Sequence, residues 1–455
     1  METDRKEFEK ELEDGEAAFR QAVADVDEFF SRKREKMGFH LRERAEELPV
    51  ERMLNFLIKQ SYQKGASDIH IEPTRTKLHI RLRINGDLIP YVSMTMEAHA
   101  AIVTKIKIMG GMNIAEKRIP QDGKYMYLEE KISADIRIST LPTLFGEHIV
   151  MRILGGIGKE KLMEIQNLGM TPGQMQEFEK ILKSPNGLLL ISGPTGSGKT
   201  TTLYAVLHQM LQKPIHIITV EDPVEKVMDG VTQVQVNQKA GLTFQTVLRS
   251  ILRQDPDVIM IGEIRDGETA SIGVRAAITG HFVLASIHTN DCASSVIRLL
   301  DMGVPSYMAA AALTGIVSQR LVKLLCPYCK VSYVPEDADV KGQLLFGAHL
   351  DIPSDGPCRI QSEKQCKKPM PKILWRANGC EHCNGTGYIG RTAVYEIVRM
   401  DETLSSMVAK GASVQEIREY ERESKVVFLR DAVMELVLRG ETSVEEMEKI
   451  VYSVN

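Results

Sequence analysis

GLLLISGPTGSGKTTTLYAVLHQM, residues 187–210, is the stretch that decides the predicted fold. Its apolar start, Gly187–Ser192, predicts a buried strand, and its end has a helical pattern. Between them, Gly193–Thr200 matches the phosphate-loop pattern G-x-x-x-x-G-K-[ST]. Glycines let backbone N–H groups turn inward around a phosphate at the positive end of a helix. An ordinary glycine-rich turn is the alternative, but the strand before it and the helix after it favour a nucleotide site.

The polar residues of this loop have distinct expected roles. The Lys199 ammonium would reach the β- and γ-phosphates, and the Thr200 hydroxyl would be a ligand of Mg²⁺. We therefore expect ATP and Mg²⁺ as cofactors. The loop residues expected at the nucleotide are Gly193, Thr195, Gly196, Ser197, Gly198, Lys199 and Thr200.

Two later apolar runs are followed by carboxylates. ITVEDPVE, Ile218–Glu225, has three acidic residues after a strand pattern, and clustered carboxylates suit Mg²⁺ and water positioning. DPDVIMIGEIRD, Asp255–Asp266, looks like a Walker B strand in which Gly262 replaces the usual acidic residue. Glu263 would orient or deprotonate the attacking water, or hold Mg²⁺ through water. A turn at Asp222-Pro223 and a solvated glutamate are the alternatives.

A fourth apolar run, HFVLASI, is flanked by His281 and His288. The two histidines have two interpretations. They are hydrogen-bonded core residues, or they are functional groups that contact the γ-phosphate or a neighbouring subunit. Because helical patterns separate the four runs, residues 165–325 are predicted to form a parallel sheet with helices on both faces.

The residues before this core predict a second, smaller domain. Residues 49–154 combine helical patterns with alternating strands and an Asn85-Gly86 hairpin turn, which predicts an α+β domain. Residues 1–48 predict a charged helical arm, either docked on the body or binding a partner. The glycines near residue 155 predict a hinge, so 155–164 is taken as a linker.

Residues 326–390 hold six of the seven cysteines. Two Cys-x-x-Cys pairs suit a tetrahedral Zn²⁺ site, whose role would be structural because four thiolates close it. Cys358 and Cys366 lie between the pairs and leave the ligand assignment open, as do redox chemistry and incidental thiols. Residues 391–455 have helical patterns and predict a helical C-terminal region. The expected zinc ligands are Cys326, Cys329, Cys380 and Cys383.

The composition limits the classes of protein to which this chain can belong. The 455 residues carry a formal net charge of −4, which gives no general attraction to nucleic acid or anionic lipid. No apolar run approaches the roughly 20 residues that span a bilayer, and the charged start lacks the apolar stretch of a secretory signal. We expect a cytoplasmic protein without a membrane span. The alternatives are a nucleic-acid translocase on the same core and a scaffold that binds ATP without turnover.

Four elements, in order, resemble those of the type II secretion and type IV pilus assembly ATPases: GPTGSGKTTT, ITVEDPVE, LRQDPDVIMIGEIRD and TGHFVLASIHTND. They match the family's Walker A motif, Asp box, atypical Walker B motif and His box. ASDIHIEP, AEKRIPQDGK and STLPTLFGEHIVMRIL resemble its N-terminal half, so the likeness covers roughly residues 50–455. The tetracysteine segment resembles the assembly and secretion branch, because retraction motors generally lack it.

The resemblance implies a fold, an activity and partners. The fold would be a RecA-like P-loop core after a PAS-like α+β domain, in a homo-hexameric ATPase. ATP hydrolysis would drive pilin or pseudopilin assembly through a polytopic inner-membrane platform protein, at the cytoplasmic face of the membrane and without nucleic acid. A DNA-uptake pilus motor is an alternative within the family. The arm before residue 50 is shorter than the family's usual N-terminal region, which leaves the docking partner open.

The resemblance also assigns residues by position. Lys199, Thr200 and Thr201 match phosphate and Mg²⁺ contacts. The expected catalytic residues are Lys199, Glu221 of the Asp box, Glu263 as the catalytic glutamate, and His288; His281, the other residue of the His box, is expected at the nucleotide. Family arginines that approach the γ-phosphate match Arg137, Arg152, Arg249 and Arg253.

Overall fold

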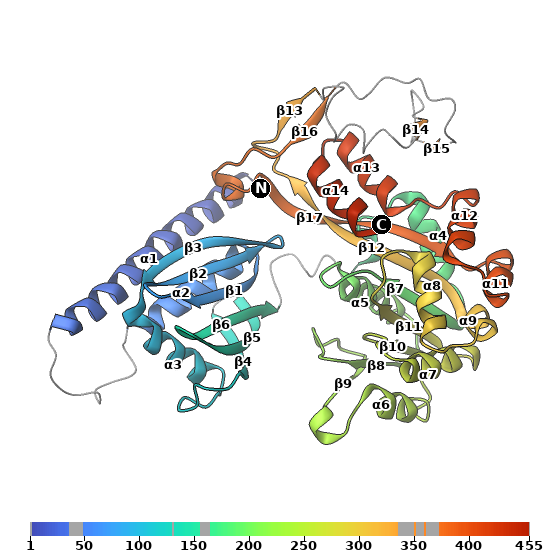
Figure 1. Cartoon of the computed structure of the whole chain (residues 1–455), viewed down its shortest axis with the longest axis horizontal. Coiled ribbons are helices and arrows are strands. Elements are labelled where there is room, and N and C mark those ends of the chain that lie inside the picture. The colour runs from blue at the N-terminus through green and yellow to red at the C-terminus, as the bar shows by residue number, and fades with distance from the viewer. Residues whose placement is uncertain are drawn as a thin grey trace. The chain divides into compact units, whose positions relative to one another are not determined.

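The computed structural model describes residues 2–35, 49–129, 132–154, 164–334, 350–351, 359–360 and 373–454. The chain divides into two compact units, 1–160 and 161–455 (Figure 1). Each unit combines helices with a β-sheet, which confirms the predicted mixed α/β class. Almost all of the predicted linker, 155–164, lies outside the described residues.

The first unit is built on a six-stranded antiparallel sheet in the order β3-β2-β1-β6-β5-β4. Helices pack on its apolar face. In α1, Phe19, Val23 and Val26 are buried in the same core, so the arm docks on this unit, as one interpretation of the sequence proposed. The elements are α1 Glu2–Glu35, α2 Pro49–Gln63, β1 Ala66–Pro73, β2 Lys77–Ile84, β3 Asp87–Thr95, η1 Met96–Ala98, α3 His99–Met109, β4 Gln121–Glu129, β5 Ile132–Thr143 and β6 Gly146–Leu154.

The second unit is built on a seven-stranded sheet in the order β17-β12-β7-β11-β10-β8-β9. All neighbouring strands are parallel except β12 and β17. The strands are β7 Gly187–Ser192, β8 Ile217–Glu221, β9 Thr232–Gln235, β10 Val258–Ile261, β11 Phe282–Ile287, β12 Leu313–Leu325 and β17 Tyr388–Arg399, with the smaller pairs β13 Val331–Tyr333 with β16 Leu374–Arg376 and β14 Leu350–Asp351 with β15 Arg359–Ile360.

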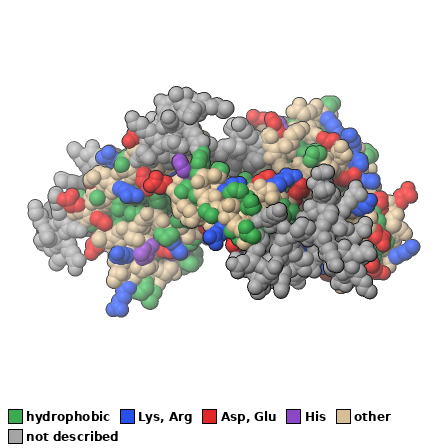
Figure 2. Space-filling model, turned by 90° about the horizontal axis from the view of Figure 1, so that it is seen from above, with side chains coloured by type: hydrophobic (Ala, Val, Ile, Leu, Met, Phe, Trp, Pro, Cys, Tyr) green, Lys and Arg blue, Asp and Glu red, His purple; other side chains and the backbone are tan. Residues whose placement is uncertain are grey.

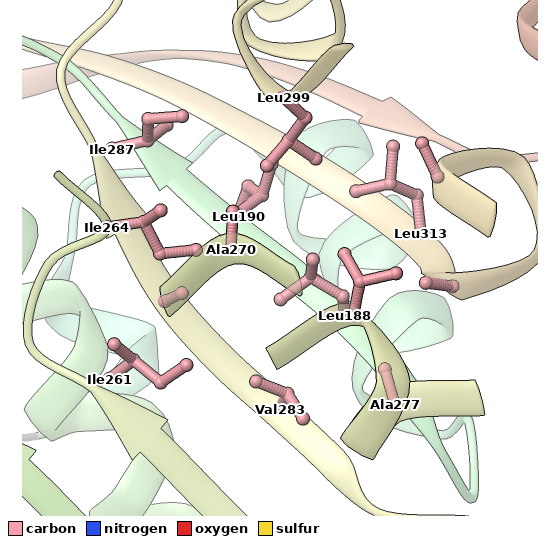
Figure 3. Close-up of a cluster of buried hydrophobic side chains, with 14 of the residues drawn as sticks. Leu188, Leu190, Ile261, Ile264, Ala270, Ala277, Val283, Ile287, Leu299 and Leu313 are labelled. Atoms are coloured by element: carbon pink, nitrogen blue, oxygen red, sulfur yellow. The ribbon is translucent and has the colours of Figure 1, made fainter. Parts of the chain in front are cut away.

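Helices cover both faces of this sheet, as predicted. Leu188 and Leu190 of β7 point to one face, where Ala270 and Ala277 of α7 pack in the same core (Figure 3). Alternate residues of β7 point to the other face, towards α4 and α5. The helices are η3 Ile165–Asn167, α4 Pro172–Leu182, α5 Lys199–Met210, η4 Gln238–Ala240, α6 Phe244–Ile251, α7 Gly267–Ile278, α8 Cys292–Asp301, α9 Ser306–Ala312, η5 Glu381–Cys383, α11 Glu402–Ala409, α12 Val414–Glu423, α13 Leu429–Leu438 and α14 Val444–Val454.

The prediction of helices from residue 391 onward is wrong for residues 391–399. These residues belong to β17, which pairs antiparallel with β12 at the edge of the main sheet. Tyr395 and Ile397 face the core beside α4, whereas Val394 packs with α13 and α14 on the other side. Successive side chains thus point to opposite faces and both faces are covered, so Val394–Val398 are buried without interruption.

The surface carries charges of both signs. Over the face seen in Figure 2, lysine and arginine side chains are interspersed with acidic ones.

Within the described ranges, no helix is both long and apolar enough to cross a bilayer.

Candidate nucleotide site

The candidate site lies at the edge of the seven-stranded sheet that is formed by the carboxyl ends of its central strands, and not beside an outer strand. Strands β7, β11, β10 and β8 are adjacent and parallel, so their carboxyl ends meet at this edge. Ser192 at the end of β7 pairs with Ile287 of β11, so the phosphate loop and His288 begin side by side. Glu263 follows β10 and Glu221 ends β8. Open α/β sheets bind ligands at this edge.

The loop has the backbone geometry of a phosphate cradle. Gly193, Gly196 and Gly198 have φ angles of 145°, 79° and 91°, which side chains with a Cβ rarely adopt. A Cβ at Gly193 would lie 2.6 Å from the Gln319 carbonyl oxygen. The Lys199 ammonium donates to the carbonyl oxygens of Gly193 (2.7 Å) and Pro194 (3.0 Å), so the lysine lies over its own loop. The loop and its lysine therefore fit a polyphosphate.

The charge of Lys199 depends on its surroundings. Burial, with a smaller contribution from the Arg320 cation, lowers the pKa of Lys199 to about 8, and the Glu263 carboxylate opposes that shift. A bound phosphate would favour the charged ammonium, because an opposite charge nearby stabilises the ionised form.

Glu263 lies in a cluster with His288 and Arg265. Its carboxylate is 3.6 Å from His288 Nε2 and forms an ion pair with Arg265. Burial and the Lys199 charge lower the pKa of His288, whereas Glu263 opposes that shift. The structure thus brings Lys199, Glu263 and His288 together. Arg265 was missed by the sequence reasoning, and its position two residues after Glu263 was the available signal.

Glu221 is buried and accepts three side-chain hydrogen bonds. Its carboxylate accepts bonds from Tyr204 (2.5 Å), Thr219 (2.6 Å) and Gln233 (3.1 Å), so it is fixed at the end of β8. The structure explains why a glycine, and not the usual acidic residue, occupies position 262 beside this strand. A Cβ there would lie 3.2 Å from the Val220 carbonyl oxygen and 3.3 Å from Glu221 Cα, so a larger side chain would press on β8.

Gln319 of β12 is a second residue that the sequence reasoning missed. Its side-chain amide donates to the Ser197 carbonyl oxygen and accepts from the Thr202 hydroxyl, both at 2.8 Å. Gln319 is almost fully buried, and its two bonds connect the phosphate loop to the first turn of α5. In the sequence, the only sign of this role is that the polar stretch Ser318–Arg320 interrupts an otherwise apolar run.

One residue expected at the nucleotide, His281, lies away from this edge. His281 precedes β11, and its carbonyl oxygen accepts from Gly187 at the start of β7, at the opposite edge of the sheet. Within one chain it is therefore not part of the cluster. Arg249 of α6 forms an ion pair with Glu268, at the start of α7. Arg253, which follows α6, donates to the Arg249 carbonyl oxygen.

Arg137 and Arg152 belong to the first unit. They are register partners on β5 and β6. Arg152 Nε donates to Asp68 Oδ1 at 2.9 Å.

The four expected zinc ligands form one cluster. Their sulfur atoms all lie within 4.8 Å of one another, and Cys326–Cys380, Cys329–Cys383 and Cys380–Cys383 are each 3.8 Å apart. A tetrahedral ion with bonds of ~2.3 Å places its sulfur ligands about 3.8 Å apart, so the cluster fits Zn²⁺. Cys358 and Cys366 lie outside the described residues.

Backbone donors surround these sulfur atoms. Cys383 Sγ accepts from the N–H groups of Cys380 and Gly387, each at 3.1 Å. Burial raises the pKa of Cys383, but these bonds, together with hydrogen bonds from the Cys380 and Cys329 thiols, lower the pKa to about 7. Such donors stabilise the thiolate that a metal requires.

Comparison with known proteins gives a consistent result. Residues 43–449 match a family model described as Type II/IV secretion system protein. The chain is 42% identical over 402 residues to the type IV pilus assembly ATPase PilB of Thermus thermophilus, which covers 88% of this chain and 43% of that protein. It is 39% identical over 428 residues to the type II secretion system ATPase E of Vibrio cholerae, covering 94% and 80%. The chain thus spans less than half of the Thermus relative.

Two solved structures share the fold. The ATPase DotB of Legionella pneumophila has a TM-score of 0.62 at 17% identity, over 90% of this chain and 98% of that one. The pilus retraction motor PilT with bound ADP has a TM-score of 0.56 at 22% identity, over 87% and 96%. At these identities the likeness concerns the fold alone.

Proposed function

Because the chain belongs to the family of type II/IV secretion system proteins and is an ATPase of that family, we propose that it powers assembly of a type IV pilus or of a type II secretion pseudopilus. The main support for the proposal is that the side chains of Lys199, Glu263 and His288 lie close together beside the phosphate loop. A loop, a cation, a carboxylate and an imidazole at one sheet edge are the groups that phosphoryl transfer to water needs.

Each residue of the site has a defined task. The Lys199 ammonium binds the β- and γ-phosphates, and the loop glycines present backbone N–H groups to them. The Glu263 carboxylate accepts a hydrogen bond from the attacking water and orients it in line with the γ-phosphate. His288 and Arg265 hold that carboxylate in place. Glu221 is held rigidly one strand away, where it positions water. Mg²⁺, held by the Thr200 hydroxyl, would neutralise charge on the phosphates.

The finer architecture is proposed from the family resemblance. It comprises a RecA-like core, a preceding PAS-like domain and a homo-hexameric ring. Arg137, Arg152, Arg249 and Arg253 are proposed to approach the γ-phosphate, from the same or a neighbouring subunit. Guanidinium groups there would stabilise the charge that develops during transfer. The domain limits after residues 48, 154, 164 and 325 belong to the same proposal, whereas the limit after residue 390 falls inside β17 and is not kept.

The partners are likewise proposed. The ring would act at the cytoplasmic face of the membrane on a polytopic platform protein, and movement of that protein would add pilins or pseudopilins to a fibre. The similarity to one pilus-assembly and one secretion ATPase supports both machines.

The proposal is tested in the native host. Replacing the chromosomal gene by a Glu263→Gln copy is expected to abolish either surface pili or export of the secreted proteins, with unchanged protein abundance. Electron microscopy of pili, analysis of the secreted proteins and DNA-uptake assays identify which machine is affected. Normal pili, secretion and DNA uptake in this strain would contradict the proposal. Stimulation of the purified ATPase by single-stranded DNA would favour a nucleic-acid translocase instead.

We also propose that the tetracysteine cluster holds a structural zinc ion. Cys383→Ser is expected to remove zinc from the purified chain and to lower its unfolding temperature, because structural zinc contributes apparent free energies of ~10–16 kcal/mol in isolated zinc fingers. Metal analysis by mass spectrometry and thermal unfolding measure both effects. Cys358→Ser and Cys366→Ser are the matched controls and should retain the ion. Loss of zinc in either control, with retention in Cys383→Ser, would overturn the ligand assignment.

A further inference from the structure

The sheet of the first unit has a polar face opposite its apolar core. Side chains alternate along its strands, so His70 and Glu72 of β1 point away from the buried Ile69 and Ile71. On the adjacent strand β6, Ile149 pairs with Ile71. The residue before it, His148, therefore lies beside Glu72 on the same face.

The three side chains converge on one point. Glu72 Oε1 is 3.9 Å from His70 Nδ1 and 3.8 Å from His148 Nε2. One ligand atom from each residue lies within 4.8 Å of the other two. The side chains of His70, Glu72 and His148 are only 14%, 23% and 25% exposed, so the two strands hold them in place.

His148 has an unused ligand atom at this point. Its Nε2 atom is buried, and within the described part of the chain it has no hydrogen-bond partner. A buried polar atom without a partner costs free energy, because it has lost its water. A ligand that accepts the lone pair of this nitrogen would remove that cost.

We propose that His70, Glu72 and His148 bind a divalent transition-metal ion, separate from the tetracysteine cluster. Two imidazoles and one carboxylate form a ligand set typical of zinc, nickel and iron sites with open coordination positions. Bonds of ~2.0–2.2 Å place such ligand atoms roughly 3.3 Å apart. The two Glu72–histidine separations need to close by about half an ångström for such bonds to form.

Neighbouring cations leave room for the ion. Arg81 on β2 donates to Glu72 Oε1, the oxygen on which the two histidines converge, and that oxygen keeps a second lone pair for a metal. Such an outer donor commonly fixes the orientation of a metal-binding carboxylate. Arg83, two residues along the same strand and on the same face, is 3.7 Å from the Asp68 carboxylate, which also accepts a hydrogen bond from Arg152 and so shares its charge between the two arginines.

Nickel titration of the zinc-loaded, full-length protein tests this site. Nickel favours imidazole ligands, whereas the filled tetracysteine cluster presents only thiolates. We expect calorimetry and dialysis with metal analysis to find one nickel ion per chain without release of zinc. His148→Ala and His70→Gln should each weaken nickel binding by about 10-fold or more, which is the size of effect that even outer-shell changes cause.

His79→Ala is the matched control. His79 also lies on the polar face, on β2, but its Nδ1 atom is 2.8 Å from the Ser93 hydroxyl and outside the cluster. The control should bind nickel as the wild type does. Circular dichroism and thermal unfolding show whether each variant is folded; two independent variants keep the test valid if one is not. Absence of nickel binding in the wild type, or equal loss in His79→Ala, would overturn the proposal and leave the ATPase assignment unaffected.

Discussion

Replacing Lys199 by alanine is expected to lower ATP turnover by about 10³-fold or more while the protein stays folded. The ammonium is the one cation that the loop itself holds over the phosphate position, through the Gly193 and Pro194 carbonyl groups. Without it, no side chain of the loop places a positive charge at the β- and γ-phosphates. The free energy of unfolding should change by no more than about 1–3 kcal/mol, since two hydrogen bonds are lost outside the core.

Phosphate release and denaturant unfolding measure the two quantities separately. Lys213→Ala is the matched control, because Lys213 follows the same helix, α5, but is exposed. The control should keep wild-type turnover. Wild-type turnover in Lys199→Ala would show that ATP is cleaved elsewhere, and loss of the fold would show that Lys199 serves mainly as a structural residue.

Replacing Glu263 by glutamine is expected to lower kcat by about 10²–10⁴-fold and to leave ATP binding intact. Glutamine keeps the size of the side chain but cannot accept a proton from the attacking water. The nucleotide is held mainly by the phosphate loop, so its dissociation constant should stay close to that of the wild type. Single-turnover kinetics and nucleotide titration distinguish the chemical step from binding.

The control for this variant is Glu423→Gln, which removes one exposed carboxylate at the end of α12. It should change neither kcat nor ATP affinity. If Glu263→Gln weakened ATP binding as strongly as it lowered kcat, Glu263 would act on nucleotide binding rather than on water. If kcat were unchanged, the attacking water would have to be positioned by another group, for which Glu221 is the nearest candidate by sheet order.

Sequence reasoning found the strands that are buried on both faces and consist mostly of apolar residues. The β7, β8, β10 and β11 runs are of this kind, and they fixed the parallel sheet. It did not find β12, because Gln319, Arg320 and Lys323 interrupt its apolar pattern. These polar residues are buried with distant partners; Gln319 binds Ser197 and Arg320 donates to the Asn290 carbonyl oxygen. Periodicity cannot reveal partners that are far away in the sequence.

The same limit applies to the candidate site. His281 and His288 look equivalent beside one apolar run, yet a strand of this length separates them by about 20 Å and places them at opposite sheet edges. The spacing of two residues along the chain therefore could not tell which histidine meets Glu263. The motif did locate Lys199 and Glu263, because both follow apolar strands whose direction is fixed by the parallel sheet. The roles of Arg265 and Gln319 became visible only with the side-chain contacts.

The most direct measurement is a structure of the protein with Mg²⁺ and a nonhydrolysable ATP analogue. Our prediction is that the triphosphate lies in the loop at Gly193–Thr200, with Lys199 on its β- and γ-phosphates and Glu263 facing the γ-phosphate. A nucleotide bound elsewhere while this loop is empty, or a γ-phosphate beyond the reach of both Lys199 and Glu263, would contradict it.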